Sequence, residues 1–240
     1  MIAKDVVFIH GITSFGNSHF RTKRALEAQG YVFHNPDLPG HGDNKTSIPK
    51  FNEIIQFVID YINKNIGERK FIIFGHSMGG GIAQYLCKIF NDQISLVILE
   101  CPLSLAILSY ADNEKYKHEY ENNALNDFKV NENSLSSKNN IASLAGWLGS
   151  KISYLPLLLE IISPKTLELF ASAQSFFENK KVLLVLGKND RIVPTYSTLF
   201  YFKKICKNIT VNLLNTNHNP FNEDTENFNK LVINYLKENN

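Results

Sequence analysis

The sequence predicts an α/β protein with a mostly parallel sheet of about six strands and flanking helices. Two observations carry this prediction. Short apolar runs rich in Val, Ile, Leu and Phe recur along the chain, and segments with apolar residues at helical spacing separate most of them. Such alternation predicts parallel strands with helices on both faces, where ligands bind beyond the carboxyl ends of the strands. The predicted strands are residues 5–11, 31–37, 70–75, 94–100, 181–187 and 209–215.

Three amphipathic helices are predicted from apolar residues spaced at i, i+3, i+4 and i+7. The first has Ser47 as a candidate N-cap and Pro49 near its first turn. Its apolar stripe contains Phe51, Ile54, Ile55, Val58 and Ile62. The second covers residues 81–90, with a stripe of Ile82, Tyr85, Leu86 and Ile89. The last covers residues 221–239 and carries Phe228, Leu231, Val232 and Tyr235.

The alternation breaks between residue 102 and about residue 178, where no strand is evident. An insertion after the fourth strand leaves the sheet at its carboxyl edge and returns there. We therefore predict a core domain of residues 1–101 and 179–240, covered by a helical cap of residues 102–178. The Asn-rich part of this segment could instead be a solvated loop. Apolar residues expected to line a pocket, or else only to pack within the cap, are Trp147, Leu155, Leu157 and Leu158.

Composition argues against several classes of protein. The 240 residues are 44% hydrophobic and carry a formal net charge of +2 without a basic stripe, so nucleic acid is not an expected partner. The longest apolar block, residues 152–162, is too short to span a bilayer and contains Pro156 and Glu160, so no stable membrane insertion is expected. The three cysteines predict no disulfide, and the start of the chain lacks a secretory signal pattern. We expect a cytoplasmic protein; its oligomeric state stays open.

The segment FIIFGHSMGGGIAQYL, residues 71–86, places Ser77 between a buried strand and a helix. Three consecutive glycines follow Met78, although each glycine near a helix start costs roughly 0.5–1 kcal/mol relative to alanine. A turn that holds a serine in a strained conformation needs neighbours without side chains. Residues 75–79, Gly-His-Ser-Met-Gly, match the G-x-S-x-G nucleophile elbow. The alternative is a glycine-rich turn in which Ser77 only caps the helix.

A nucleophilic serine needs a base within hydrogen-bond reach and an acid that orients the base. Of the seven histidines, His218 follows the last strand and precedes the final helix, which places it at the required edge of the sheet. His76 lies inside the elbow and is expected to point away from Ser77. Asp190, in the loop after strand 181–187, is the first candidate for the acid. Glu100, at the end of strand 94–100, is the rival.

The oxyanion formed during attack on a carbonyl needs two backbone donors. The N–H of Met78 is one candidate, because the helix start points it toward the site. The N–H of Ile12 is the other, because Gly11 lets the loop after the first strand come close. This chemistry requires no metal, and no His/Cys cluster with metal-ligand spacing is present in the sequence, so no cofactor is expected.

Five motifs in this order resemble the α/β-hydrolase superfamily, in its lipase-like esterase and aminopeptidase branch. They are HG at 10–11, DLPGHG at 37–42, GHSMGG at 75–80, GKNDRIVP at 187–194 and NHNPF at 217–221. The resemblance covers the chain outside the cap and implies a Ser77–His218–Asp190 triad with Ile12 and Met78 at the oxyanion hole. Members of the family usually have an antiparallel hairpin before the His-Gly strand, which this sequence lacks; we therefore expect the smaller sheet of about six strands.

The resemblance implies hydrolysis through an acyl-enzyme. A carboxylic ester with a small or medium, largely apolar acyl group is the first expectation for this small-molecule substrate. An aminopeptidase is the second, with Glu160 or Glu168 as candidate groups to hold an amino terminus. Thioester hydrolysis and acyl transfer are not separated from these by sequence. A non-catalytic ligand-binding member of the fold is the alternative from a different class.

Overall fold

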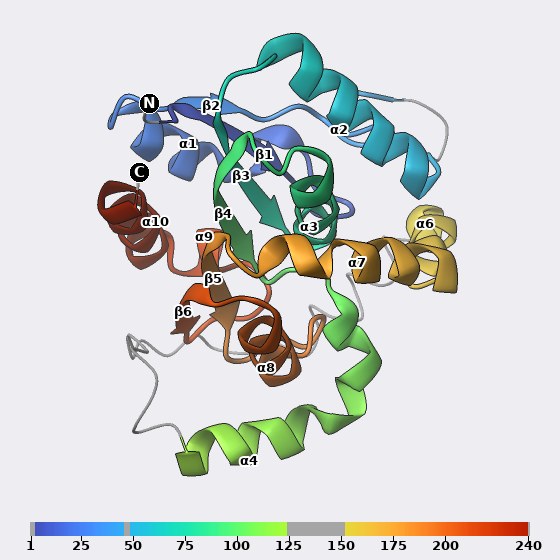
Figure 1. Cartoon of the computed structure of the whole chain (residues 1–240). Helices are drawn as coiled ribbons and strands as arrows, with labels where there is room; N and C mark the ends of the chain where they lie inside the picture. Colours follow the sequence, from blue (N-terminus) through green and yellow to red (C-terminus); the bar gives the residue numbers. More distant parts are fainter. Residues whose placement is uncertain (1–2, 46–48, 124–151, 240) are drawn as a thin grey trace.

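The computed structural model describes residues 3–45, 49–123 and 152–239. Its centre is a six-stranded sheet in the order β2-β1-β3-β4-β5-β6, and every neighbouring pair is parallel (Figure 1). All six predicted strands are present, and the predicted fold class is confirmed. The strands are β1 (Asp5–Ile9), β2 (Val32–His34), β3 (Phe71–His76), β4 (Ile94–Glu100), β5 (Lys181–Gly187) and β6 (Asn208–Leu214).

Helices cover both faces of the sheet. One face carries α2 (Phe51–Asn65), α3 (Met78–Ile89), α7 (Pro164–Phe177) and α8 (Thr195–Ile205). The other face carries α1 (Phe20–Glu27) and α10 (Thr225–Asn239) (Figure 1). Helix α1 is an addition to the helices that the sequence predicted. The remaining helical segments are η1 (Gly16–His19), η2 (Leu105–Asp112), α4 (Asn113–Asn123), η3 (Ile152–Tyr154), α6 (Leu155–Ile161) and α9 (Pro220–Glu223).

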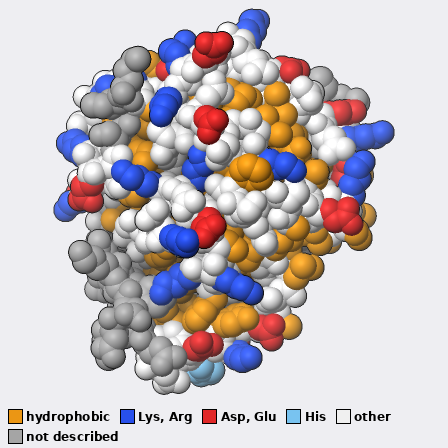
Figure 2. All heavy atoms as spheres, viewed as in Figure 1, with side chains coloured by type: hydrophobic (Ala, Val, Ile, Leu, Met, Phe, Trp, Pro, Cys, Tyr) orange, Lys and Arg blue, Asp and Glu red, His pale blue; other side chains and the backbone are white. Residues whose placement is uncertain are grey.

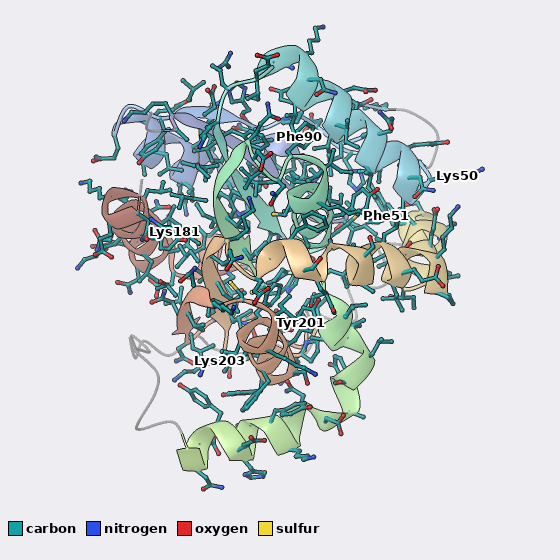
Figure 3. All side chains as sticks on the ribbon, in the orientation of Figure 1. Lys50, Phe51, Phe90, Lys181, Tyr201 and Lys203 are labelled. Atoms are coloured by element: carbon teal, nitrogen blue, oxygen red, sulfur yellow. The ribbon has the colours of Figure 1, made fainter. Side chains whose placement is uncertain are left out.

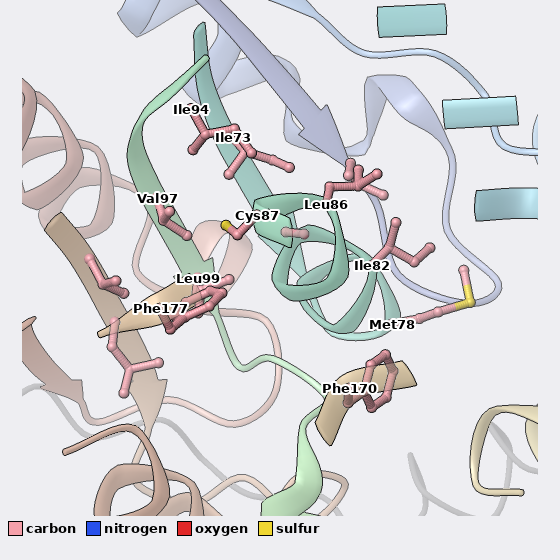
Figure 4. Close-up of a cluster of buried hydrophobic side chains, with 14 of the residues drawn as sticks. Ile73, Met78, Ile82, Leu86, Cys87, Ile94, Val97, Leu99, Phe170 and Phe177 are labelled. Atoms are coloured by element: carbon pink, nitrogen blue, oxygen red, sulfur yellow. The ribbon is translucent and has the colours of Figure 1, made fainter. Parts of the chain in front are cut away.

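The four central strands, β1, β3, β4 and β5, contribute alternate side chains to two hydrophobic cores, as the two-residue period of a strand requires. In β1, Val7 and Ile9 pack toward α2 and α3, whereas Val6 and Phe8 pack toward α1 and α10. Figure 4 shows part of the first core around α3 and β4, in which Leu86 and Leu99 are fully buried. Because both faces are covered, the strands read as nearly continuous apolar runs in the sequence.

Helix α2 begins at Phe51, with Lys50 at its N-cap. The carboxylate of Glu53 accepts a hydrogen bond from the Lys50 N–H at 3.1 Å, and Glu160 of α6 accepts one from the Phe51 N–H at 2.9 Å. Figure 3 labels Lys50 and Phe51 at the end of α2 beside α6. Two carboxylates thus satisfy orphan donors at this helix start. The predicted cap residue, Ser47, lies outside the described residues.

The described parts of the predicted cap, residues 102–123 and 152–178, contain helices and no strand. Helix α7 packs against α3, the helix that follows Ser77. Trp147 and all but the first two residues of the Asn-rich stretch 122–140 lie outside the described residues. The division into core and cap stays a prediction.

Charges of both signs are mixed on the face of the molecule shown in Figure 2, where Lys and Arg lie among Asp and Glu. This agrees with the near-balanced composition of 25 basic and 23 acidic residues. Among the described helices, we find none whose length and apolar character would let it cross a membrane.

Candidate active site

Ser77 stands at a sharp turn between β3 and α3. Its backbone φ of 53° and ψ of −120° put it in a region that non-glycine residues rarely occupy. The chain packs very closely around this turn, which the glycines make possible: a Cβ on Gly79 would lie 2.0 Å from the carbonyl oxygen of Ile9. Such crowding explains why a helix start tolerates several unfavourable glycines. The local geometry is that of a nucleophile elbow rather than a simple helix cap, and no side-chain cap hydrogen bond is made by Ser77.

The structure brings Ser77, His218 and Asp190 together in one hydrogen-bonded chain. The Ser77 Oγ lies 2.8 Å from His218 Nε2, and His218 Nδ1 lies 2.7 Å from Asp190 Oδ2. Ser77 follows β3, Asp190 follows β5 and His218 follows β6, so all three come after the carboxyl ends of parallel strands, at one edge of the sheet. The side chains of His218 and Asp190 are 10% and 2% exposed. Serine, base and acid therefore have the spacing needed for proton transfer.

Asp190 holds both its own loop and the histidine. Its Oδ1 accepts hydrogen bonds from the N–H groups of Ile192 and Val193, at 2.8 and 3.1 Å, while Oδ2 faces His218. The rival acid, Glu100, makes different contacts: its carboxylate binds His19 and the backbone N–H of Phe221. Among the described carboxylates, Asp190 is thus the one hydrogen-bonded to the imidazole of His218.

The electrostatics of the pair favour an imidazolium held beside a carboxylate. Burial alone would lower the pKa of His218, but the charge of Asp190 and the hydrogen bond to it raise that pKa above its ordinary value. Glu100 and Glu223 act in the same direction. Burial alone would raise the pKa of Asp190, yet His218 and the two backbone donors lower it. Asp190 is therefore ionised at neutral pH and His218 is a stronger base than a free imidazole.

The loop after β1 lies directly against Ser77. A Cβ on Gly11 would sit 3.0 Å from the Ser77 Cβ, so glycine permits this close approach. The chain then reverses at Thr13, whose φ is 63°, and the Ser14 N–H donates to the Gly11 carbonyl at 3.2 Å. Ile12 in this loop and Met78 at the start of α3 both line the pocket that contains Ser77.

A cavity of about 700 Å³ opens beside the three residues. Its apolar wall comes mainly from η2, α6 and the loop after Asp190, and includes Leu103, Ile107, Leu158, Ile161, Ile162 and Val193. Of the four cap residues expected at the pocket, Leu158 lies there. Leu157 is instead buried in the main core, and Leu155 is 51% exposed. The difference arises because neighbouring residues on a helix face different directions, and the sequence does not say which direction meets the pocket.

Glu160 and Glu168, the two acidic groups expected to serve a peptidase, do not line the pocket. Glu160 is engaged with the start of α2, and Glu168 is exposed on α7. Glu223 does line the cavity, but its carboxylate accepts hydrogen bonds from the backbone of Asn217 and Asn219. The described residues thus offer little to hold a substrate ammonium group.

One cluster has atoms of the kinds that ligate metals: a sulfur, an oxygen and a nitrogen of Cys101, Asp190 and His218 lie within 4.8 Å of one another. The Asp190 and His218 atoms that face each other already share a short hydrogen bond. Burial raises the pKa of the Cys101 thiol well above its ordinary value, so the thiol stays protonated. The Asp190 and His218 atoms are thus engaged with each other, and the thiol is not in the thiolate form that ligates metals.

Sequence reasoning missed the role of His19, which carries no motif of its own. It is buried in the structure, and its Nε2 lies 2.7 Å from Glu100 Oε2. The sequence pointed to this contact only through Glu100: a carboxyl group at the end of a buried strand needs a hydrogen-bond partner.

Comparisons with known proteins place the chain in a family. A family model described as the alpha/beta hydrolase fold matches residues 5–148. A Mycoplasma genitalium protein named "Putative esterase/lipase 3" is 28% identical over 98% of this chain and 87% of its own length. "Putative esterase/lipase 2" of the same organism is 26% identical over 96% and 88%. A Paleococcus ferrophilus monoacylglycerol lipase has the same fold, with a TM-score of 0.67 and 20% identity over 100% of this chain and 96% of the other. The chain belongs to the α/β-hydrolase fold family.

Proposed function

We propose that this protein is a serine hydrolase that cleaves carboxylic esters of small or medium, largely apolar acyl groups. The observation that carries the proposal is the hydrogen-bonded chain Ser77–His218–Asp190 beside a cavity with an apolar wall. The relatives named as esterase/lipase support the same class of reaction. The catalytic roles below are part of this proposal.

Acylation begins with Ser77, whose Oγ attacks the ester carbonyl carbon while His218 Nε2 takes the hydroxyl proton. The resulting imidazolium is stabilised by the Asp190 carboxylate at Nδ1. The negative charge that forms on the carbonyl oxygen is stabilised by the N–H groups of Ile12 and Met78. Their contribution is large because the donors are held in place before the charge develops.

The second half of the cycle releases the products. His218 donates its proton to the departing alkoxide, so the alcohol leaves neutral and the acyl group stays on Ser77. A water molecule then attacks the acyl carbonyl carbon while His218 takes a proton from it. His218 returns that proton to Ser77 Oγ as the bond between Oγ and the acyl carbon breaks, so the carboxylic acid is released and the serine is regenerated. No residue beyond these is needed to balance the protons.

The apolar wall of the cavity favours a hydrocarbon acyl group over a charged one. We expect Leu158→Trp to lower kcat/KM for an octanoyl ester relative to an acetyl ester by about 10-fold or more, because a larger side chain shortens the pocket. The measurement is a series of p-nitrophenyl esters of increasing chain length. Leu159→Trp is the matched control, since Leu159 is 59% exposed on the same helix and should leave the ratio unchanged.

The pH dependence should follow the ionisation of His218. Only neutral His218 can accept the Ser77 proton, and its raised pKa lies above the ordinary 6.5. We therefore expect kcat/KM to fall as the pH drops through this raised pKa and to level off at alkaline pH. The test is kcat/KM for p-nitrophenyl acetate across the pH range, corrected for spontaneous hydrolysis. An acid limb centred below 6.5 would contradict the proposed pairing with Asp190.

The preference for esters is tested against its closest rival, amide hydrolysis. The ester panel is run beside aminoacyl p-nitroanilides, which an aminopeptidase would cleave to release p-nitroaniline; the esters release p-nitrophenolate, so each series is followed by its own absorbance. The positions of Glu160 and Glu168 away from the cavity favour esters. Faster turnover of the anilides would replace the ester assignment with a peptidase.

A further inference from the structure

A buried polar cluster lies beside the triad, on the face of the sheet that α1 and α10 cover. Its centre is Glu100, the last residue of β4, which is 0% exposed. The Glu100 Oε2 lies 2.7 Å from Nε2 of His19, and His19 is 1% exposed. The Ser18 Oγ lies 3.0 Å from the other ring nitrogen of His19. None of these three side chains takes part in the steps proposed above.

Glu100 connects the segments that carry the nucleophile and the base. Its backbone carbonyl accepts a hydrogen bond from the Ser77 N–H at 3.0 Å. Its carboxylate Oε1 accepts one from the N–H of Phe221 at 2.9 Å. Phe221 is the third residue after His218, so the contact fixes the loop that carries the base. A shift of this loop would change the distance between His218 and Ser77 directly.

His19 adds a third segment to the same cluster. It ends η1, which continues the loop from Ile12, the proposed oxyanion donor. Its ring stacks on Phe221 with centroids 3.6 Å apart and planes 20° apart. The hydrogen bonds are all satisfied if the Ser18 hydroxyl donates to Nδ1 and the Nε2–H donates to an ionised Glu100. In that arrangement Glu100 is an anion and His19 is neutral.

Burying this carboxyl group is costly, and an apolar pair would fill the same space without that cost. We propose that Glu100 and His19 are positioning residues for His218: they tie its loop to the nucleophile strand and to the oxyanion loop, and they place a second carboxylate near the imidazole. The inference rests on the proposed catalytic role of His218.

The charges around Glu100 agree with this role. The titratable groups that face it are His19 from η1, His76 from β3, Cys101 after β4, His218 from the loop after β6 and Glu223 from α9. Burial raises the pKa of Glu100 to about 7, while the nearby histidines and the Phe221 N–H act to lower it. In turn, Glu100 is one of the groups that raise the pKa of His218. An ionised Glu100 therefore stabilises the imidazolium that forms during catalysis.

Glu100→Gln tests the charge separately from the shape. The amide oxygen can still accept from Phe221, and the amide nitrogen can donate to His19 if that ring changes tautomer with Ser18 as acceptor. We expect kcat to fall about 10-fold with KM little changed. This loss is much smaller than the largest losses caused by misplaced catalytic groups. We also expect the acid limb of the kcat/KM profile to move to lower pH, because the imidazolium loses a stabilising charge.

His19→Phe is the second variant, and it keeps the ring stacked on Phe221. It removes the hydrogen bond to Glu100, so the buried carboxyl group should take up a proton near neutral pH. The expected result is the same fall in kcat and the same direction of shift. Asp5→Asn is the matched control: Asp5 pairs with His34 at 2.8 Å, but at the amino end of β1, at the opposite edge of the sheet. It should leave the acid limb in place.

All variants are compared by circular dichroism, by labelling with a fluorophosphonate and by pH profiles with p-nitrophenyl acetate. A folded Glu100→Gln or His19→Phe protein whose acid limb coincides with that of the unmodified protein overturns the inference, whatever its kcat. If one variant does not fold, the other carries the same test. Failure of the unmodified protein to hydrolyse esters or to be labelled would instead refute the proposed function.

Discussion

Replacing Ser77 by alanine should lower kcat for an activated ester by about 10⁶-fold, the size of loss that removal of the nucleophile causes in a serine protease. The reason is that the acyl-enzyme route disappears entirely, because alanine has no oxygen to attack the carbonyl. The pocket and the oxyanion donors remain, so a small residual rate above that of water is expected. The measurement is turnover of p-nitrophenyl acetate, with circular dichroism to establish that the variant is folded.

Covalent labelling gives the same test without dependence on the substrate. A fluorophosphonate phosphonylates an activated serine and loses fluoride, so mass spectrometry should place the adduct on Ser77 and find none in Ser77→Ala. Ser14→Ala is the matched control: Ser14 lines the same cavity and is not part of the proposed triad. It should be labelled normally. A folded, unmodified protein that resists labelling would favour a ligand-binding role for the fold over catalysis.

The sheet could be predicted well from the sequence, because several independent patterns indicated the same fold. Six short strand-like runs, four of them buried and apolar on both faces, and glycines crowded around Ser77 are patterns that few other folds produce. Helix α1 was not predicted, since its residues FRTKRALE bury only Thr22 and Leu26 and leave a weak apolar stripe. The orientation of α6 could not be predicted either, because six of the seven residues of LPLLLEI are apolar and lie on nearly every side of the helix.

The choice between the two acids shows where reasoning from sequence ends. Asp190 follows β5, and Glu100 is the last residue of the neighbouring strand β4. Both therefore lie at the edge of the sheet that carries Ser77. What separates them is the direction of each side chain. Glu100 follows the alternation of β4 toward α1, where His19 binds it, whereas Asp190 lies in a loop that turns its carboxylate to His218. The local sequence does not predict the direction of either side chain.

The acid assignment gives the second large prediction. In Asp190→Asn the amide oxygen can keep the hydrogen bonds from Ile192 and Val193, which leaves the amide nitrogen facing His218 Nδ1. An N–H donor at that place selects the tautomer with the proton on Nε2, the atom that must accept the Ser77 proton. The substitution also removes the charge that stabilises the imidazolium. The fold should survive, because the loop keeps its own hydrogen bonds.

We expect Asp190→Asn to lower kcat by about 10³-fold or more; the corresponding change in a serine protease costs about 10⁴-fold. Glu100→Gln, with its expected loss of about 10-fold, is the internal comparison, since both variants exchange a buried carboxylate for an amide of the same shape. Both are measured on one activated ester at the same neutral pH. If Glu100→Gln lost most of the activity and Asp190→Asn kept it, Glu100 would be the acid of the triad. Ser77 and His218 would keep their proposed roles.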